Sequence, residues 1–320
     1  MPEVLLTKSR LTAWRRCKRF HRLRYLDGWE SASRSEALTF GTIVHAGLEA
    51  YWSKRIVDDM TVNVDPILEI KAEEILLAYT KVAWPDRDDY EVVAVEHPVR
   101  FPLLNPDTMQ ASRTYEMASV IDLVLKRKST GEMILVEHKT TGSDFSDDAA
   151  DYWNRLSMDP QLSLYVVACE AEGWKIDRII YDVMARPQLR LKLATPLDKR
   201  RYTKKGVLDA RQRELDETPE DFRARLRADI TERPERYFGR REIARVESEI
   251  QDGMLDTWEE AKAIRQAELS GRHPRNPDAC HLYGNTCEYY DLCALGVNPA
   301  ESALYVKREA HPELPKAITA

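Results

Sequence analysis

The chain has no long apolar run. Its first residues, MPEVLLTKSRLTAWRRC, contain no continuous hydrophobic segment as long as a signal peptide or a membrane span. We therefore expect a cytoplasmic protein without a membrane partner. An apolar content of 43% over 320 residues is still enough to bury a full core, so the composition predicts one globular domain over residues 1–320.

The chain also lacks a net positive charge. Its 48 Lys and Arg residues stand against 54 Asp and Glu residues, which gives a formal charge of −6. This balance excludes a wholly basic nucleic-acid coat protein, but it allows a localised basic groove. Basic residues gather in the run DKRRYTKKG at 198–206 and in an N-terminal segment that includes Arg15, Arg16, Arg19 and Arg22. Each run is either a DNA contact or a solvated charged face.

Cysteine is scarce, and no two of the five cysteines form the close Cys-x-x-Cys pair that is typical of zinc ribbons. In a reducing cytoplasm a disulfide framework is not expected. Cys280, Cys287 and Cys293 are separated by six and five residues and lie among Asn, Asp, Gly and Glu. This clustering predicts a metal centre, whereas Cys169, inside the apolar run SLYVVACE, is expected to be an inert core residue.

Hydrophobic periodicity predicts a mixed α/β fold without internal repeats. Apolar spacing and turn residues indicate helices over 9–26, 41–55, about 66–82 and 159–173. Strands are predicted over 91–101, 116–126, 132–140 and 178–185, followed by a mostly helical charged region over about 206–268. We expect a central mixed sheet flanked by helices, in which the strands at 116–126 and 132–140 form a hairpin.

This predicted hairpin brings charged side chains to one place. Side chains two apart on a strand share a face, so Glu137 and Lys139 point together, and Asp122 on the partner strand can converge with them. Two adjacent carboxylates repel unless a cation lies between them, and such oxygen ligands suit Mg²⁺ or Mn²⁺. A neighbouring lysine can orient or help deprotonate an attacking water while the metal polarises a phosphodiester. The alternative is an exposed, salt-bridged hairpin.

An Asp followed after fourteen residues by Glu137-His138-Lys139 resembles the signature of the PD-(D/E)XK nuclease superfamily. The run FGTIVHAGLEAYW, with His45, and the run DPQLSLY, with Gln161 and Tyr165, resemble its RecB-like branch. The resemblance implies a restriction-endonuclease-like core over 40–185 with a catalytic set of Asp122, Glu137, Lys139, Gln161 and Tyr165. It implies metal ligands at His45, Asp122, Glu137 and the backbone carbonyl of His138. A structural histidine and simple helix packing are the alternatives for His45 and Tyr165.

The cysteines extend this resemblance. Some phage exonucleases, AddB-type helicase–nucleases and CRISPR-associated spacer-acquisition nucleases of this branch carry a [4Fe–4S] cluster, with one ligand from an N-terminal helix and three from beyond the core. The resemblance implies that Cys17, in the helix at 9–26, and the three cysteines of segment 275–296 hold such a cluster: Cys280, Cys287 and Cys293. Zn²⁺ in the same four thiolates is the alternative. Either centre would tie two distant parts of the chain together.

The function implied by the resemblance is a metal-dependent exonuclease that acts on DNA ends in phage recombination, repair or replication. A CRISPR-associated spacer-processing nuclease and a non-catalytic iron–sulfur DNA-binding or assembly module are the alternatives. The expected partners are DNA and a recombination, helicase or CRISPR-adaptation protein. Arginines interleaved with Trp14, Phe20 and Tyr25 in the first helix suit a path for single-stranded or end-bound DNA.

Overall fold

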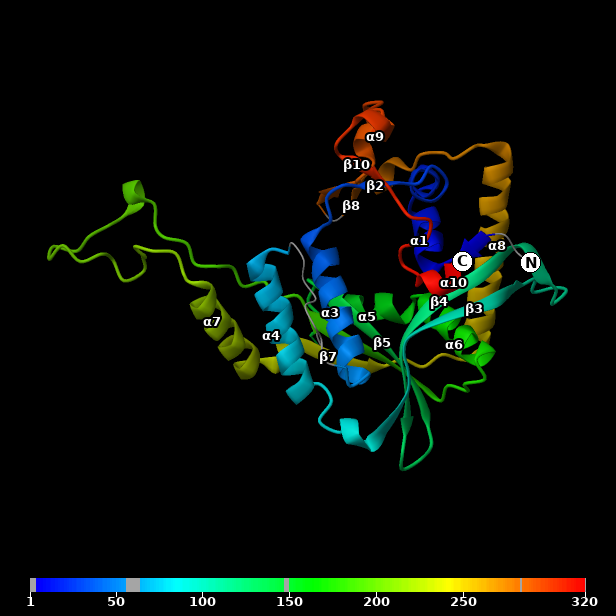
Figure 1. Ribbon diagram of the computed structural model, residues 1–320, viewed down its shortest axis with the longest axis horizontal. Coiled ribbons are helices and arrows are strands. Elements are labelled where there is room, and N and C mark those ends of the chain that lie inside the picture. The colour runs from blue at the N-terminus through cyan, green and yellow to red at the C-terminus, as the bar shows by residue number, and fades with distance from the viewer. Residues whose placement is uncertain (1–3, 56–63, 147–149, 283, 320) are drawn as a thin grey trace.

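A mixed six-stranded sheet lies at the centre of the molecule, with helices on both of its faces (Figure 1). The structure is a computed structural model that describes residues 4–55, 64–146, 150–282 and 284–319. None of the helices in these ranges combines the length and the hydropathy that crossing a membrane requires. The predicted α/β class with a central sheet between helices is confirmed.

The elements follow the chain in a largely alternating order. The helices are α1 Lys8–Arg16, α2 Lys18–His21, a π-helical turn at Arg22–Leu26, α3 Glu36–Trp52, α4 Pro66–Val82, α5 Ala150–Ser157, α6 Gln161–Ala171, α7 Pro219–Glu232, α8 Glu247–Ser270, α9 Tyr290–Ala294 and α10 Lys316–Thr319. The strands are β1 Val4–Leu6, β2 Trp29–Ser31, β3 Tyr90–Leu104, β4 Ala111–Arg127, β5 Met133–Thr141, β6 Arg178–Ala185, β7 Phe238–Glu242, β8 His281–Leu282, β9 Asn285–Thr286 and β10 Tyr305–Lys307.

The central sheet has the order β1-β4-β5-β6-β7, and β3 also pairs with β4. β4 is antiparallel to both β3 and β5, whereas β6 runs parallel to β5. A parallel pair needs a long crossover connection, which α5 and α6 provide between β5 and β6. This topology places the ends of β4, β5 and α6 next to one another.

Each face of the sheet is covered by its own hydrophobic core. On one face α6 and α8 pack over Leu135 and Tyr181, and on the other α3, α4 and α7 pack over Val136 and Ile180. Successive residues of β5 and β6 therefore enter opposite cores. This explains why these strands read as nearly continuous apolar runs rather than as an alternating pattern.

The early and late parts of the chain together build a small lobe, which we call the terminal lobe and which comprises residues 17–31 and 274–310. β10 pairs antiparallel with β2, and the Tyr289 hydroxyl donates a hydrogen bond of 2.6 Å to the carbonyl of Trp29. Phe20, Tyr289 and Tyr305 form a third apolar cluster here. Figure 1 shows this lobe, with α9, β10 and β2, above α3 and the sheet.

The helix predicted over 9–26 is interrupted at its middle. α1 begins at Lys8 rather than Ser9, because Thr7 caps it by accepting a hydrogen bond from the amide of Arg10. Cys17 has extended backbone angles, φ −166° and ψ 126°, and separates α1 from α2. The helix that was predicted to contain Cys17 is therefore broken at this residue, and the cysteine faces the C-terminal segment, where Asn276 N–H donates to its sulfur.

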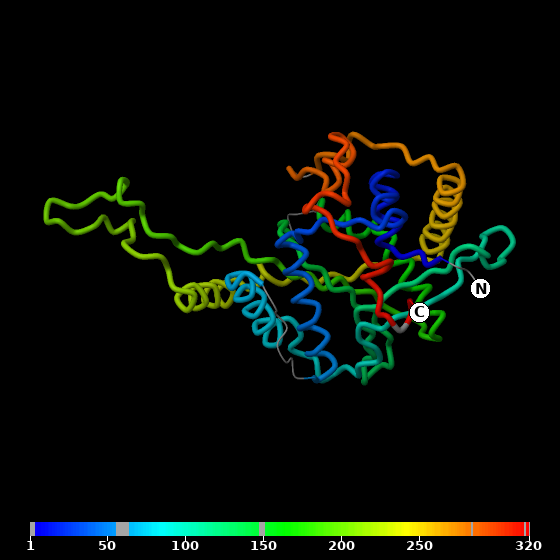
Figure 2. The backbone as a smooth tube through the Cα atoms, turned by 45° about the horizontal axis from the view of Figure 1, so that its top comes forward, coloured from blue at the N-terminus to red at the C-terminus, as the bar shows by residue number. Residues whose placement is uncertain are grey.

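The region predicted as mostly helical over about 206–268 is only partly so. Residues 186–217 form an extended arm that projects far from the sheet, as both Figure 1 and Figure 2 show. The predicted helical character appears in α7 and in α8, and between these two helices β7 adds an edge strand by pairing with β6. The charged sequence FGRRE of β7 has no apolar period, so its strand conformation depends on tertiary pairing.

Candidate active site

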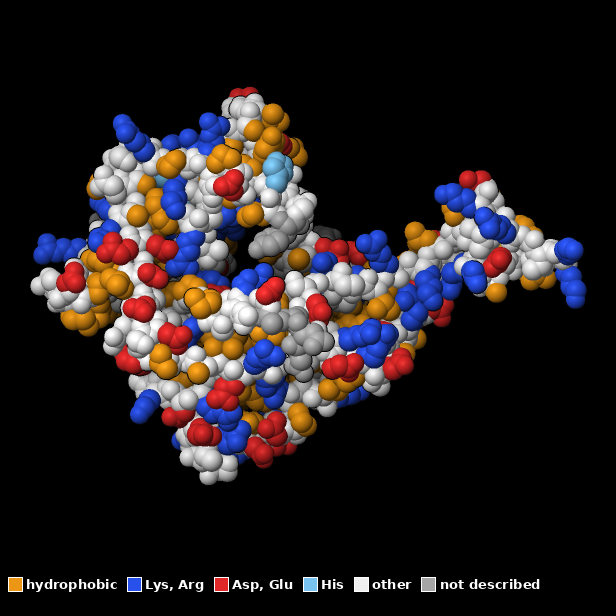
Figure 3. Space-filling model, turned by 180° about the vertical axis from the view of Figure 1, so that it is seen from behind, with side chains coloured by type: hydrophobic (Ala, Val, Ile, Leu, Met, Phe, Trp, Pro, Cys, Tyr) orange, Lys and Arg blue, Asp and Glu red, His pale blue; other side chains and the backbone are white. Residues whose placement is uncertain are grey.

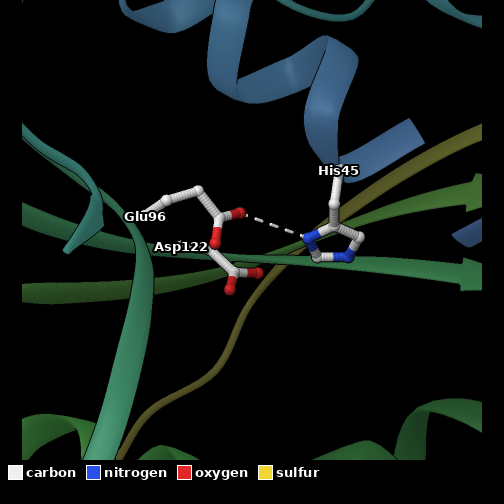
Figure 4. A group of neighbouring side chains, drawn as sticks. All are labelled: His45, Glu96 and Asp122. Atoms are coloured by element: carbon white, nitrogen blue, oxygen red, sulfur yellow. Dashed lines mark hydrogen bonds and ion pairs between the residues drawn. The ribbon is translucent and has the colours of Figure 1, made fainter. Parts of the chain in front are cut away.

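Three side chains from three elements meet at the centre of the sheet (Figure 4). His45 comes from α3, Glu96 from β3 and Asp122 from β4, and their ligand atoms all lie within 4.8 Å of one another. His45 Nδ1 is 3.4 Å from Glu96 Oε1. One imidazole and two carboxylates form a donor set that suits a divalent cation such as Mg²⁺ or Mn²⁺.

Glu96 is a member of this group that the sequence did not reveal. It has a φ of 43°, a conformation that residues other than glycine seldom adopt. Val95 pairs with Leu123 and His97 with Ile121, so Glu96 stands opposite Asp122 in the β3–β4 ladder. Such local strain is tolerated where the surrounding structure enforces it, and here it directs a carboxylate to Asp122. The irregular register between the two strands concealed this pairing from sequence reasoning.

Glu137 and Lys139 point together from β5, as the strand period predicts. Lys139 Nζ donates to Glu137 Oε1 at 2.5 Å and to Gln161 Oε1 at 2.8 Å. Gln161 Nε2 in turn donates to the hydroxyl of Tyr165 at 2.6 Å, one helical turn along α6. The structure therefore places Gln161 and Tyr165 behind the lysine, where they fix its position.

Asp122 is held beside the same strand by the main chain. The amide of His138 donates a 2.9 Å hydrogen bond to Asp122 Oδ2. The His138 side chain lies elsewhere, with Nδ1 3.4 Å from the carboxylate of Asp182, which also accepts hydrogen bonds from Tyr79 and Trp84. This buried group belongs to the core, and only the carbonyl of His138 remains as a predicted metal ligand.

Lys8 is a second residue that the sequence analysis missed. From the first turn of α1 its Nζ donates to Gln161 Oε1 at 2.6 Å and to Asp159 Oδ2 at 3.2 Å. Burial and the proximity of Lys139 lower the pKa of Lys8. Two lysines thus share one amide oxygen. No local sequence pattern marks Lys8, because only the packing of the N-terminal helix brings it to this place.

The electrostatics of the site favour the binding of a cation. Burial, and then the charge of Asp122, raise the pKa of Glu137 to about 7, although Lys139 opposes the shift. Burial disfavours protonated His45, but its hydrogen bond with Glu96 and the nearby carboxylates outweigh burial and raise its pKa to about 9. Glu137 Oε2 is buried without a hydrogen-bond partner among the described residues. This orphaned oxygen fits a metal ligand.

Most of the N-terminal arginines already have partners within the protein. Arg15 pairs with Glu260 of α8, Arg22 lies 3.2 Å from Asp27, and Arg16 stacks over the Phe20 ring at 4.5 Å. The backbone amide of Arg19 donates to the carbonyl of Pro274. Contact of these arginines with DNA stays a prediction.

Four cysteines distant in sequence surround one small cavity of about 30 Å³, between α1 and the C-terminal segment. The cavity is lined by Cys17, Cys280, Cys287 and Cys293, together with Phe20 and Tyr289 among others. The amide of Asn276 donates to Cys17 Sγ at 3.3 Å, and the amide of Cys287 donates to the carbonyl of Cys280 at 2.8 Å. The fifth cysteine, Cys169, is fully buried in α6, and burial raises the pKa of its thiol to about 12.

The positions of the cysteine sulfurs can be compared with the geometry of a zinc site. Among the described residues, the cysteine sulfurs form no group of three within 4.8 Å of one another. Tetrahedral zinc with Zn–S bonds of about 2.3 Å would bring its sulfur ligands to about 3.8 Å from one another. Any three of the four sulfurs therefore include a pair more than 4.8 Å apart, which is wider than bound zinc would hold them.

The space-filling view shows an opening that passes through the molecule between the terminal lobe and the rest of the chain (Figure 3). The lobe carries the cysteines, and the part below it carries α3 and β5, which hold His45, Glu137 and Lys139. The cysteine cavity and the carboxylate site therefore belong to the two parts that enclose this opening.

Comparison with known proteins gives one decisive match. No curated protein matches the chain. Among solved structures, a candidate exonuclease from Eubacterium rectale has a TM-score of 0.46 and 10% identity, covering 91% of this chain and 93% of its own. The protein SSO0001 has a TM-score of 0.23 and 14% identity, covering 61% and 85%. Both scores are too low to carry an argument.

The decisive match is to a family model. The model described as PD-(D/E)XK nuclease superfamily matches residues 6–294, a range that contains His45, Glu96, Asp122 and the Glu137–Lys139 pair. Nucleases of this kind use divalent metals, which agrees with the donor set found here. The chain belongs to the PD-(D/E)XK nuclease superfamily.

Proposed function

We propose that the chain is a metal-dependent deoxyribonuclease that removes nucleotides from DNA ends, and that it serves phage recombination, repair or replication. The observation that carries the proposal is the convergence of His45, Glu96 and Asp122 beside the hydrogen-bonded pair Glu137 and Lys139. Carboxylates, an imidazole and a lysine within one site match the needs of phosphodiester hydrolysis.

The metal ligands in this proposal are His45, Glu96, Asp122 and Glu137, with the backbone carbonyl of His138 as a further one. The unpartnered Oε2 of Glu137 and the raised pKa of its carboxyl support a role as ligand. Bound Mg²⁺ or Mn²⁺ would polarise the scissile phosphate and lower the pKa of a coordinated water. His45 must release its proton to become a ligand, because only neutral imidazole binds metal.

The lysines supply positive charge where the phosphate would lie. Glu137 and Gln161 fix Lys139 Nζ at 2.5 and 2.8 Å, so its ammonium group is already oriented before substrate binds. Lys139 orients the attacking water and stabilises the developing negative charge. Lys8, on the same Gln161 oxygen, adds a second cation for the substrate phosphate. Tyr165 holds Gln161 and acts as a positioning residue.

We further propose that Cys17, Cys280, Cys287 and Cys293 hold a [4Fe–4S] cluster. Their placement around one cavity supports a shared metal centre, and the resemblance to iron–sulfur nucleases favours the cluster over zinc. Anaerobically purified protein is expected to be brown and to contain iron and acid-labile sulfide. Stoichiometric zinc without iron in the purified protein would contradict the cluster.

The decisive experiment for the nuclease uses end-labelled DNA. Purified protein is incubated with linear single-stranded and duplex DNA and with closed circular DNA, in Mg²⁺ or Mn²⁺. Wild type is expected to release short products from linear DNA and to leave circles intact. Lys139→Ala should lose this activity, whereas Lys175→Ala, at an exposed lysine between α6 and β6, should keep it.

Equal product from wild type and Lys139→Ala would remove the catalytic assignment. Cleavage of closed circles at the rate of linear DNA would show an endonuclease instead of an exonuclease.

A further inference from the structure

The segment between β6 and α7 is built as an arm, which we define as residues 186–217. Its two halves pair with each other: Glu217 N–H donates to the carbonyl of Lys192 at 2.8 Å, and Thr195 N–H donates to the carbonyl of Arg213 at 2.9 Å. Tyr202 and Leu208 form an antiparallel bridge near the tip. The arm is therefore a self-paired ribbon, and it extends away from the sheet in both Figure 1 and Figure 2.

The base of this arm is firmly anchored. Glu217 is buried and forms a two-pronged ion pair with Arg225 of α7, with both contacts at 2.7 Å. Its second oxygen also accepts the amide of Lys192 at 2.9 Å. Such bidentate pairs define an orientation as well as a contact. The fold thus holds the ribbon in a defined direction at its root.

The distal half of the arm concentrates positive charge. Residues 199–213 contain seven Lys and Arg residues and a single acidic residue, Asp209, in a chain whose net charge is −6. The seven are Lys199, Arg200, Arg201, Lys204, Lys205, Arg211 and Arg213, and all but the half-buried Arg200 are exposed. Blue side chains line the arm in the space-filling view (Figure 3).

These cations differ from their neighbours in having no acidic partner. In α7, Arg223 and Arg227 both pair with Glu74, and Arg233 pairs with Asp229. Among the residues that the structure describes, none of the seven distal cations forms an ion pair. An unneutralised basic ribbon fits an anionic partner from outside the chain.

The root of the arm lies at the end of the sheet where β5, the strand that carries Lys139, also terminates. The arm follows β6, whose Val183 pairs with Lys139 and whose Ala185 pairs with Thr141. A groove of about 670 Å³ begins here, and its walls include Arg186, Arg233 and Arg236. A polymer held at Lys139 can therefore leave the site along this groove and reach the arm.

We propose that the arm binds the phosphate backbone of the same DNA molecule whose end occupies the active site, at a distance from the cut. This inference rests on the proposed nuclease function and adds a second DNA contact to it. The twelve residues from Lys192 to Thr203 include the 3₁₀ turn Leu197–Lys199, so they span at most about 36 Å, the length at about 3.3 Å per fully extended residue. The ribbon matches about ten base pairs of duplex at about 3.4 Å each.

The test compares two triple variants that change net charge equally. One replaces the exposed arm lysines: Lys199→Gln, Lys204→Gln and Lys205→Gln. The control replaces exposed lysines of the body: Lys81→Gln, Lys126→Gln and Lys175→Gln. Binding of the full chain to a 40-nucleotide strand, a 40-base-pair duplex and a 6-nucleotide strand is measured by fluorescence anisotropy over a range of salt concentrations, without added metal.

The arm variant should bind the 40-nucleotide strand, the 40-base-pair duplex or both more weakly than wild type. The magnitude of the slope of log affinity against log salt should fall by about two to three, because each lost phosphate contact lowers that slope by about 0.7 to 0.9. The arm variant should bind the 6-nucleotide strand with the affinity of wild type, because this strand is too short to reach the arm. The control variant should bind all three DNAs with the affinity and salt slope of wild type. Unfolding midpoints verify that both variants fold.

An unchanged salt slope in the arm variant, or an equal loss in the control, overturns the proposal and leaves an acidic protein as the partner of the arm. The two proposals fail separately. If the wild-type protein hydrolyses no DNA but the arm variant shows the reduced salt slope, the nuclease proposal is contradicted and the proposal for the arm is supported.

Discussion

At the scale of single residues, the fold raises the pKa values of two groups in the site, Glu137 and His45. Glu137 is 2% exposed and lies near Asp122, so its ionised form is costly even with Lys139 beside it. His45 carries a proton that a metal ligand must lose. Metal binding and proton release are therefore coupled at this site.

This coupling predicts how the stability of the metal-free protein depends on pH. Glu137, with a pKa raised to about 7, binds a proton in the folded state that the unfolded chain releases near 4.5, and His45, raised to about 9, does so above 6.5. The folded state therefore binds more protons, and its free energy of unfolding should fall as pH rises from about 5 to 9.

The measurement is thermal unfolding in chelator at several pH values, with Glu137→Gln as the matched variant. The variant should lose the part of the decline between about pH 4.5 and 7. Adding Mn²⁺ should stabilise wild type increasingly as pH rises, because fewer protons then compete with the metal. A gap between wild type and variant that is constant from pH 5 to 8 would contradict the assignment.

Lys8 is the second residue-scale prediction. Replacing it by Met keeps most of the side-chain volume but removes the cation, and a charge-assisted contact is worth about 1.5–3 kcal/mol. We expect kcat/KM on end-labelled DNA to fall about ten- to hundredfold in Lys8→Met and to recover in part in Lys8→Arg. A purely structural Lys8 would instead lower the unfolding midpoint and leave kcat/KM unchanged.

The residues that the sequence allowed us to find differ from those it concealed in a physical way. Asp122, Glu137 and Lys139 were found because the strand period and one short hairpin place them together. Glu96 and Lys8 were not, because their positions depend on a strand register and on helix packing between segments far apart in sequence. Hydrophobic periodicity within one segment predicts neither the register between two strands nor the packing of distant helices.

At the scale of elements, the position of His45 depends on how closely α3 approaches α4. Gly47 lies two residues after His45 on α3, and a methyl group added there would come within 2.3 Å of Leu76 on α4. The absence of a side chain at Gly47 therefore lets the end of the Leu76 side chain lie directly against α3, within one turn of His45.

Gly47→Ala should consequently destabilise the protein by about 1–3 kcal/mol, the usual cost of overpacking. The displaced atoms belong to the end of the Leu76 side chain, so Mn²⁺ binding should weaken in proportion to any movement of α3, and with it His45, relative to β3 and β4. The double variant Gly47→Ala with Leu76→Ala should recover metal binding relative to the single variant. A single variant that binds Mn²⁺ as tightly as wild type would show that the helix spacing does not control the site.

Elements with a strong apolar period were predicted closely, and those defined by tertiary context were not. The helix at 66–82 and the strand at 178–185 were confirmed, since both have apolar patterns bounded by turn residues. β1 and β7 are short edge strands that exist only through pairing with β4 and β6. Beyond its root, the arm at 186–217 has no buried face, so its sequence shows no hydrophobic periodicity from which it could be predicted.

At the scale of the whole molecule, contacts between distant parts of the chain close the structure. Thr7 donates to Glu313 at 2.8 Å, Arg308 pairs with Glu313, and Arg10 pairs with Glu268. The cysteine cavity lies within this same closure. These links between early and late segments therefore support the terminal lobe in addition to its own apolar cluster of Phe20, Tyr289 and Tyr305.

Cys17→Ala should release these links together. We expect the purified variant to lose iron, to unfold at lower temperature and to lose nuclease activity. Cys169→Ala is the matched control, because this thiol is buried in α6 away from the cavity, and it should keep its iron. Full nuclease activity in an iron-free Cys17→Ala protein would show that the centre does not support the active site.

The cysteine cavity also determines when the protein can become functional during its synthesis. Cys17 leaves the ribosome early, and Cys280, Cys287 and Cys293 emerge more than 260 residues later. At about 5–20 residues per second, roughly 13–50 s of translation separate the first thiolate from its companions. β2 likewise cannot pair with β10 until β10 has been synthesised. The nascent chain thus cannot join the two segments of the terminal lobe until residues 274–310 have been synthesised, which delays completion of the lobe above the sheet until then.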